Sequence, residues 1–276
     1  MFSQQKSIQV VKIMKYGFIG LGNMGTAIMQ GMRNGSYANE TIFGYDISED
    51  RNEYVSKQLS ITIVSLKELV KEADVIVLAV KPQYMNDVLQ EIKTISLKDK
   101  LFISIAAGLE TSYFEKNLPE ARVVRVMPNL NAAYAEAISA VCDGSTATEE
   151  DIQVAEGIFE SVGETVRIAE KLVPAFSAVA GASPAFVFEF TDALAMAAVQ
   201  AGIPRALAFK IATQAVKGSA VTMQKSSEHP GSLRDKVCSP GGTTIEGIAV
   251  LEKNSFKGTV MSAVEAVIEK DKKLGK

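Results

Sequence analysis

KYGFIGLGNMGTAIMQGMR, residues 15–33, is the stretch that decides the fold of this chain. Residues 16–19 have the pattern of a short buried strand, and the glycine-rich turn after it leads into a helix with apolar residues at helical spacing. In this G-x-G-x-x-G pattern, Gly20 permits a tight turn, Gly22 lets a pyrophosphate approach the backbone, and Gly25 lets helix and strand pack closely. The pyrophosphate would lie on the free N–H groups of the new helix. The predicted dinucleotide-binding turn is Gly20, Leu21, Gly22, Asn23, Met24 and Gly25.

An acidic residue follows this turn at the distance that a ribose-binding carboxylate requires. Residues 41–45 read as the second strand, and Asp46 comes next, 21 residues beyond Gly25. A carboxylate there accepts hydrogen bonds from the adenosine ribose and repels a 2′-phosphate, by about 1 kcal/mol in water and about 4 when partly shielded. We therefore expect NAD(P)H as the cofactor with NADH preferred, and the nearby Arg51 leaves NADPH open. Asp46 as a cap of the following helix is the alternative, and both roles are compatible.

Strand and helix patterns alternate through the N-terminal half. Strands are predicted at 61–64, 74–80, 101–105, 122–126, 137–141 and 164–168, and helices at 49–59 and 148–159. This alternation predicts an α/β, Rossmann-type, doubly wound parallel sheet. Ligands of such sheets bind beyond the carboxyl ends of the strands, so the strand-end turns are expected to line the cofactor. Those residues are Ala79, Val80, Lys81, Pro82, Ala106, Ala107, Gly108 and Asn129.

Composition excludes several classes of protein. The 276 residues are 47% hydrophobic and 22% charged with a net charge of -3, as expected for a globular protein of two domains without a nucleic-acid surface. The single histidine, His229, argues against histidine-based hydrolases and multi-histidine metal sites, so no metal is expected. Cys142 and Cys238 match no metal or redox spacing, which favours reduced thiols in a cytoplasmic protein.

The expected organisation is an N-terminal extension at 1–13, a dinucleotide-binding domain at 14–169, and a helical domain at 170–276. Residues 172–188 contain no charged side chain. A membrane span is the alternative for this stretch, but Pro174, Gly181 and Pro184 favour a kinked core helix. No membrane partner is therefore expected. Three or four helices in this domain look too few to cover an apolar helix on all sides, which predicts an intertwined homodimer.

A glycine-rich loop lies in the C-terminal half. It spans 239–243, and Thr243 with Glu246 is predicted to form a capping box for the next helix. Free N–H groups at that helix start would bind an anion, whereas an ordinary interhelical turn is the alternative. His229 precedes Pro230 at another helix start and is expected to be structural.

The segment DKVCSPGGTTIEGI, residues 235–248, resembles the signature of the pyrroline-5-carboxylate reductases. Further matching motifs are GLGNMG from Gly20, AVKP from Ala79, SIAAG from Ser104, RVMPN from Arg125 and AGASPAFVF from Ala180. The resemblance implies a Rossmann domain followed by a helical dimerisation domain, with each substrate pocket completed by the partner subunit. It also implies hydride transfer from NAD(P)H to the cyclic imine 1-pyrroline-5-carboxylate, the last step of proline biosynthesis. Substrate carboxylate binding is then expected at Ser239, Gly241, Gly242, Thr243 and Thr244, with the Thr244 hydroxyl as the catalytic group near the ring nitrogen.

Two features depart from the usual pattern of that family, namely Tyr45-Asp46 at the end of the second strand and the leader before Met14. A 3-hydroxyacid dehydrogenase is the nearest rival, but such enzymes are expected to carry a catalytic lysine in the first long helix of the second domain, and none follows Lys171 there. Another imine reductase and a non-catalytic dinucleotide sensor are further alternatives. The reductase prediction requires the glycine turn and the 239–244 bend to face one cleft.

Overall fold

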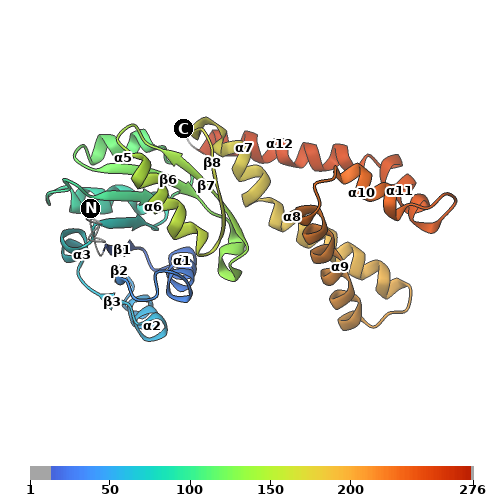
Figure 1. Cartoon of the computed structure of the whole chain (residues 1–276), viewed down its shortest axis with the longest axis horizontal. Helices are drawn as coiled ribbons and strands as arrows, with labels where there is room; N and C mark the ends of the chain where they lie inside the picture. The colour runs from blue at the N-terminus through green and yellow to red at the C-terminus, as the bar shows by residue number, and fades with distance from the viewer. Residues whose placement is uncertain (1–13, 275–276) are drawn as a thin grey trace, which may run out of the picture. The chain divides into compact units, whose positions relative to one another are not determined.

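The computed structural model describes residues 14–274, which form two compact units (Figure 1). The first unit runs to Phe176 and includes Leu274, and the second is Ser177–Lys273. The units therefore divide at 176/177, whereas the sequence placed the domain boundary at 169/170. The expected extension at 1–13 lies outside the described residues.

Within the described residues, the first unit is built on one eight-stranded sheet with the order β3-β2-β1-β4-β5-β6-β7-β8. The pairs β1–β2, β1–β4, β4–β5 and β5–β6 are parallel, as the alternating pattern predicts. This puts the carboxyl ends of five neighbouring strands, β2, β1, β4, β5 and β6, on one edge. The strands are β1 (Lys15–Ile19), β2 (Thr41–Tyr45), β3 (Thr62–Ile63), β4 (Val75–Leu78), β5 (Leu101–Ser104), β6 (Arg122–Met127), β7 (Ala137–Asp143) and β8 (Gly163–Arg167).

Helices cover both faces of this sheet, as Figure 1 shows. Side chains of α1, α2 and α6 form one apolar cluster with Phe18 and Val77, and those of α3, α4 and α5 form the other with Ile19 and Ile76. Successive strand residues thus enter opposite clusters, which explains why the central strands are apolar throughout. The helices are α1 (Asn23–Asn34), α2 (Glu49–Leu59), α3 (Leu66–Glu72), α4 (Pro82–Ile92), α5 (Thr111–Asn117) and α6 (Glu149–Glu160).

Two strands, β7 and β8, run against the predicted direction. Strand β7 is antiparallel to β6, because the 3₁₀ helix η1 (Leu130–Tyr134) reverses the chain between them without a crossover helix. Strand β8 is then parallel to β7, with α6 as their crossover. The sheet is therefore doubly wound but mixed, and the edge that collects the strand-end turns ends at β6.

The chain leaves the first unit through η2 (Glu170–Leu172) and α7 (Val173–Phe176), and a π-helix, η3 (Ser177–Gly181), precedes α8 (Ser183–Gln200). The predicted kink is confirmed, since the long apolar helix is interrupted at this π-turn. The expectation of three or four helices is wrong, because the 19-residue α12 and three others follow α8. They are α9 (Arg205–Lys225), α10 (Pro230–Val237), α11 (Thr243–Lys253) and α12 (Phe256–Leu274).

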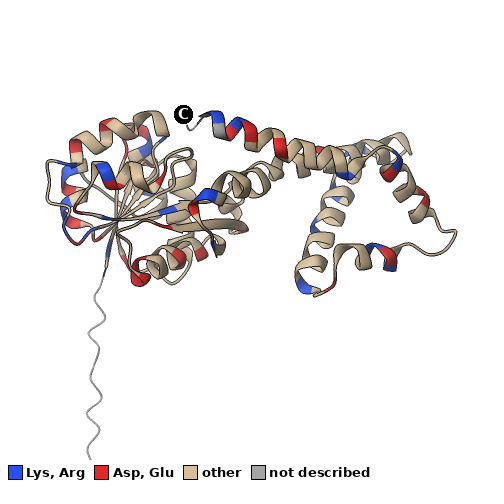
Figure 2. Cartoon of the chain, turned by 90° about the horizontal axis from the view of Figure 1, so that it is seen from above, with Lys and Arg blue, Asp and Glu red and all other residues tan. Residues whose placement is uncertain are grey.

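Large apolar side chains of the second unit lie on its surface. Its hydrophobic residues that are buried among the described ones are all alanines, namely Ala178, Ala180, Ala195, Ala208 and Ala212. The segment Glu170–Gln200 is long and apolar enough to cross a membrane, with a mean hydropathy of 1.4, and only 22% of its most apolar window is buried. Figure 2 shows the long uncharged stretches of these helices. The prediction of a core helix thus requires something outside this unit to cover α8.

Candidate active site

Glycine is needed for a different structural reason at each of the three positions of the first turn. Gly20 has φ +99°, and a Cβ there would lie 2.7 Å from the carbonyl carbon of Ala79. A Cβ on Gly25 would lie 2.4 Å from the Gly20 carbonyl oxygen, so helix α1 can approach the turn only with glycine here. A Cβ on Gly22 would meet no protein atom within 4 Å. Protein packing therefore explains Gly20 and Gly25, while Gly22 borders open space where a ligand fits.

The start of α1 is available to an anion. Its N-cap residue is Gly22, and no side chain caps the helix. The N–H groups of its first turn, at Asn23, Met24 and Gly25, have no intrahelical acceptor and point out of the helix end. Gly22 and Asn23 are exposed, whereas the Leu21 side chain is wholly buried and can contribute only its backbone. These features fit the pyrophosphate of a dinucleotide, as predicted from the motif.

Asp46 lies beside the glycine turn, at the end of β2. Its Oδ2 accepts the Leu21 N–H at 2.7 Å, and its Oδ1 accepts the Ser48 N–H at 2.9 Å. The N-cap of α2 is Ser48, so the alternative that Asp46 caps this helix is not the arrangement found. A carboxylate has about four acceptor positions, so both oxygens can still accept ribose hydroxyls.

Sequence reasoning missed three polar residues that organise this corner. Asn52 exchanges two hydrogen bonds of 2.9 Å with the main chain of Asp46. Arg51 donates to the Leu21 carbonyl oxygen and to Thr26 Oγ1. These three residues could have been found from their positions in the first two turns of α2 and α1, where side chains can reach the ends of the strands. The sequence noted Arg51 only as a neighbour of Asp46.

The remaining predicted cofactor residues gather at the same edge of the sheet. Ala79 and Val80 follow β4, with Lys81 as the N-cap of α4 and Pro82 as its first residue. Ala106, Ala107 and Gly108 follow β5, and Asn129 follows β6. Gly108 has φ +75°, and a Cβ there would meet nothing within 4 Å. Because β1, β4, β5 and β6 are parallel neighbours, these turns form one continuous rim with the glycine turn.

A partly buried ion pair joins the start of α5 and strand β6 to η2, near the end of the first unit. Glu170 Oε1 accepts from Arg125 Nη1 at 3.0 Å and from the Thr111 N–H at 2.9 Å, and its Oε2 accepts the Thr111 hydroxyl at 2.8 Å. Thr111 opens α5 after the β5 turn, and Arg125 lies in β6. Cys142 pairs with Arg125 across β6–β7, and burial raises the pKa of its thiol to about 11. The Cys142 thiol is therefore protonated at neutral pH.

The Ser239–Thr244 bend forms a second candidate anion site within the C-terminal unit. Gly241 has φ +67°, and the Gly242 N–H donates to the Ser239 carbonyl oxygen at 3.0 Å. The predicted capping box of Thr243 and Glu246 is wrong, because the N-cap is Gly242 and no side chain caps α11. Its first-turn N–H groups are consequently more available than predicted.

His229 has the expected structural role. It is the N-cap of α10, and its Nδ1 accepts the Gly231 N–H at 3.0 Å.

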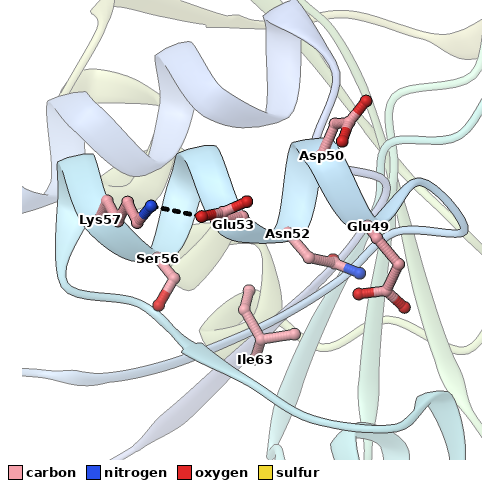
Figure 3. A pocket seen from close by; sticks show the side chains of 7 residues that line it. All are labelled: Glu49, Asp50, Asn52, Glu53, Ser56, Lys57 and Ile63. Carbon is pink, nitrogen blue, oxygen red and sulfur yellow. Dashed lines mark hydrogen bonds and ion pairs between the residues drawn. The ribbon is translucent and has the colours of Figure 1, made fainter.

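A separate surface pocket of about 460 Å³ lies beside α2 and Ile63 (Figure 3). It is lined by the carboxylates of Glu49, Asp50 and Glu53, and Lys57 pairs with Glu53. Three acidic side chains make this pocket unsuitable for an anionic dinucleotide, which fits the rim of strand-end turns instead.

Comparison with known proteins gives separate family matches for the N-terminal and C-terminal parts of the chain. Residues 170–274 match the family model described as pyrroline-5-carboxylate reductase dimerisation, and residues 15–108 match NADP oxidoreductase coenzyme F420-dependent. The pyrroline-5-carboxylate reductase of Methanosarcina acetivorans is 42% identical over 95% of this chain and 98% of its own. A dimerisation domain indicates self-association of the chain.

Solved structures of similar proteins have the same fold. The pyrroline-5-carboxylate reductase of Coxiella burnetii superposes with a TM-score of 0.91 at 30% identity, over 96% of this chain and 99% of that one. The pyrroline carboxylate reductase of Plasmodium falciparum, solved with NADP bound, superposes with a TM-score of 0.83 at 37% identity, over 95% of this chain and 98% of that one. The likeness covers both units of the chain.

Proposed function

The chain belongs to the pyrroline-5-carboxylate reductase family, and we propose that it reduces the cyclic imine 1-pyrroline-5-carboxylate to L-proline with NAD(P)H. The observation that carries the proposal is the pair of uncapped helix starts, α1 behind the glycine turn and α11 behind the Ser239–Thr244 bend. One suits a pyrophosphate and the other a carboxylate. Oxidation of NADH on addition of the imine, followed by absorbance, tests it. Absence of proline among the products would contradict it.

The protein's part in this reaction is binding and positioning. A bound nicotinamide supplies the hydride, and a protonated imine is already an electrophile, so no strong acid is required. The α1 N–H groups hold the pyrophosphate, and small residues at 106–108 leave room for the nicotinamide ring against the rim. The bend holds the substrate carboxylate through its N–H groups. Orientation of the two reactants and exclusion of water then account for the rate.

Thr244 is proposed as the residue that hydrogen-bonds the ring nitrogen of the imine. It is exposed in the first turn of α11. Thr244→Ala should lower kcat/KM for the imine roughly ten- to a hundredfold, because a hydrogen bond of about 1–3 kcal/mol is lost in the transition state. Thr244→Ser keeps the hydroxyl and is the matched control. Unchanged turnover by the alanine variant would end the assignment.

NADH is proposed as the preferred cofactor. The carboxylate of Asp46 lies against the glycine turn, where it would repel a 2′-phosphate. The wild-type protein should favour NADH in kcat/KM by at least about fivefold, which corresponds to about 1 kcal/mol of repulsion. Asp46→Asn removes the charge, keeps one acceptor for the Leu21 N–H, and should reduce this ratio. A wild-type preference for NADPH would contradict the role of Asp46.

The 3-hydroxyacid dehydrogenase alternative has no support in the second unit, since α8 carries no lysine.

The proposal also includes a homodimer that is located in the cytoplasm. The exposed apolar side chains of the second unit support the dimer, and the free thiols Cys142 and Cys238 support a reducing compartment.

A further inference from the structure

The peptide groups around Leu21 are held by side chains on both sides. The Leu21 N–H donates to Asp46 Oδ2 at 2.7 Å. Its carbonyl oxygen accepts from Arg51 Nε at 2.8 Å, from Arg51 Nη2 at 2.5 Å and from Thr26 Oγ1 at 3.0 Å. Leu21 stands between the two glycines that make the turn, and its own side chain is buried. The position of this residue, and with it the direction of the following N–H groups, is therefore fixed by side chains from the end of β2 and from the first turns of α1 and α2.

Arg51 uses most of its N–H donors in hydrogen bonds to this turn. Beyond the two bonds to Leu21, its Nη2 donates to Thr26 Oγ1 at 2.8 Å. The guanidinium carbon lies 5.0 Å from the ring centroid of Tyr54, which supports the group from its face. Only Nη1 has no hydrogen-bond partner among residues 14–274.

An arginine beside a dinucleotide site can serve in two ways. Its charge can bind the 2′-phosphate of NADPH, or its planar fork can hold the protein in shape. A bidentate phosphate clamp needs the fork of Nε and Nη2 directed at the ligand, whereas both nitrogens of Arg51 are directed at Leu21 and Thr26, which leaves Nη1 alone. The geometry therefore favours the second role.

We infer that Arg51 is a positioning residue that, opposite Asp46, holds the Leu21 backbone and thereby sets the glycine turn for either dinucleotide. The inference rests on the proposed dinucleotide-dependent reduction. This role differs from that of Asp46, which is proposed to favour NADH over NADPH. A residue that shapes the turn acts on the pyrophosphate, which NADH and NADPH share.

Calorimetric titration of the protein with NADH and with NADPH tests the inference without turnover. Arg51→Lys keeps the charge but cannot hold both acceptors in one plane. Its dissociation constants for NADH and NADPH should both rise by the same factor, roughly tenfold, as expected for one lost charge-assisted hydrogen bond. In steady-state assays, KM for the dinucleotide should rise more than kcat falls. Amide hydrogen exchange should become faster at Leu21, whose N–H donates to Asp46 Oδ2.

One control variant and one second test variant complete the experiment. Lys57→Met removes a positive charge from α2 at an exposed position and should leave both affinities unchanged. If the Arg51 variants do not fold, Thr26→Val removes the hydroxyl that links Arg51 to Leu21, and it should weaken both dinucleotides by one common factor.

Three results would overturn the inference. Loss of NADPH affinity alone would make Arg51 a phosphate clamp. Wild-type affinity in Arg51→Lys would mean that its charge suffices, and unchanged binding in Thr26→Val would remove the cluster from the site. Failure of the wild-type protein to reduce the imine would contradict the proposed function but leave these titrations valid.

Discussion

At the scale of single residues, Gly22 and Gly25 separate ligand binding from protein packing. The two glycines belong to one motif, yet only Gly25 is enclosed by protein atoms. Gly22 has φ −66°, a value that alanine adopts freely, so only a ligand at this position would exclude a methyl group. In this motif, we therefore expect Gly22 to be required for ligand binding and Gly25 for protein packing.

Substitution of each glycine by alanine should give opposite results. Gly22→Ala should unfold at the wild-type temperature but bind NADH at least roughly tenfold more weakly, because its methyl group projects toward the pyrophosphate. Gly25→Ala should lose about 1–3 kcal/mol of stability, because its Cβ would overlap the Gly20 carbonyl oxygen. Thermal unfolding with and without NADH measures both effects. Wild-type affinity in Gly22→Ala would contradict the assignment of the turn.

At the scale of secondary-structure elements, hydropathy and spacing predicted most of the sheet unit. Strand β2 and helix α2 have the predicted bounds, since Thr41–Tyr45 and Glu49–Leu59 are bordered by clear turn residues. Helices α3 and α5 were missed because each has only seven residues, too short for a periodic pattern. The direction of β7 was missed because an apolar strand reads the same in both directions.

The candidate site was predictable to the extent that its groups are backbone N–H groups in recognisable turns. The residue type and spacing of Gly20, Gly22 and Gly25 predict such a turn. The roles of Arg51 and Glu170 depend on contacts across 30 and 45 positions of the chain, which no local pattern encodes. Asn52 bonds across only 6 positions, and its place in the first two turns of α2 was the available signal. Thr243 has the sequence of a capping residue, but the helix begins one residue earlier than a cap at this position would allow.

Glu170 is predicted to be essential for the stability of the first unit. Glu170→Gln leaves the guanidinium of Arg125, whose side chain is only 6% exposed, without its carboxylate. Loss of one partner of a buried pair costs about 3 kcal/mol, so the unfolding temperature should fall clearly. Glu149→Gln removes a carboxylate from an exposed pair with Arg167 and should cost less than about 1 kcal/mol. Equal effects of the two substitutions would show that the contact between Glu170 and the buried Arg125 adds no more stability than an exposed pair.

At the scale of the whole molecule, the two units differ in how they bury apolar side chains. The sheet unit buries large residues such as Phe18, Phe102 and Phe159 completely, whereas the hydrophobic residues buried in the second unit are alanines. Phe188, Leu194, Leu207 and Phe209 are each at least 40% exposed. Exposed apolar surface of this extent marks an interaction surface. Self-association through this unit follows from its composition as well as from its family.

The last prediction concerns the oligomer. The wild-type chain should sediment as a dimer or a multiple of one, because each phenylalanine that becomes buried contributes about 1.5–3 kcal/mol. Phe188→Glu should weaken the assembly, since α8 would then bring an unpaired carboxylate into an apolar contact. Tyr84→Glu is the matched control: Tyr84 lies on α4 of the sheet unit and is 58% exposed, as is Phe188. A stable, active wild-type monomer would contradict the dimer, and an unchanged oligomer in Phe188→Glu would exclude this residue from the interface.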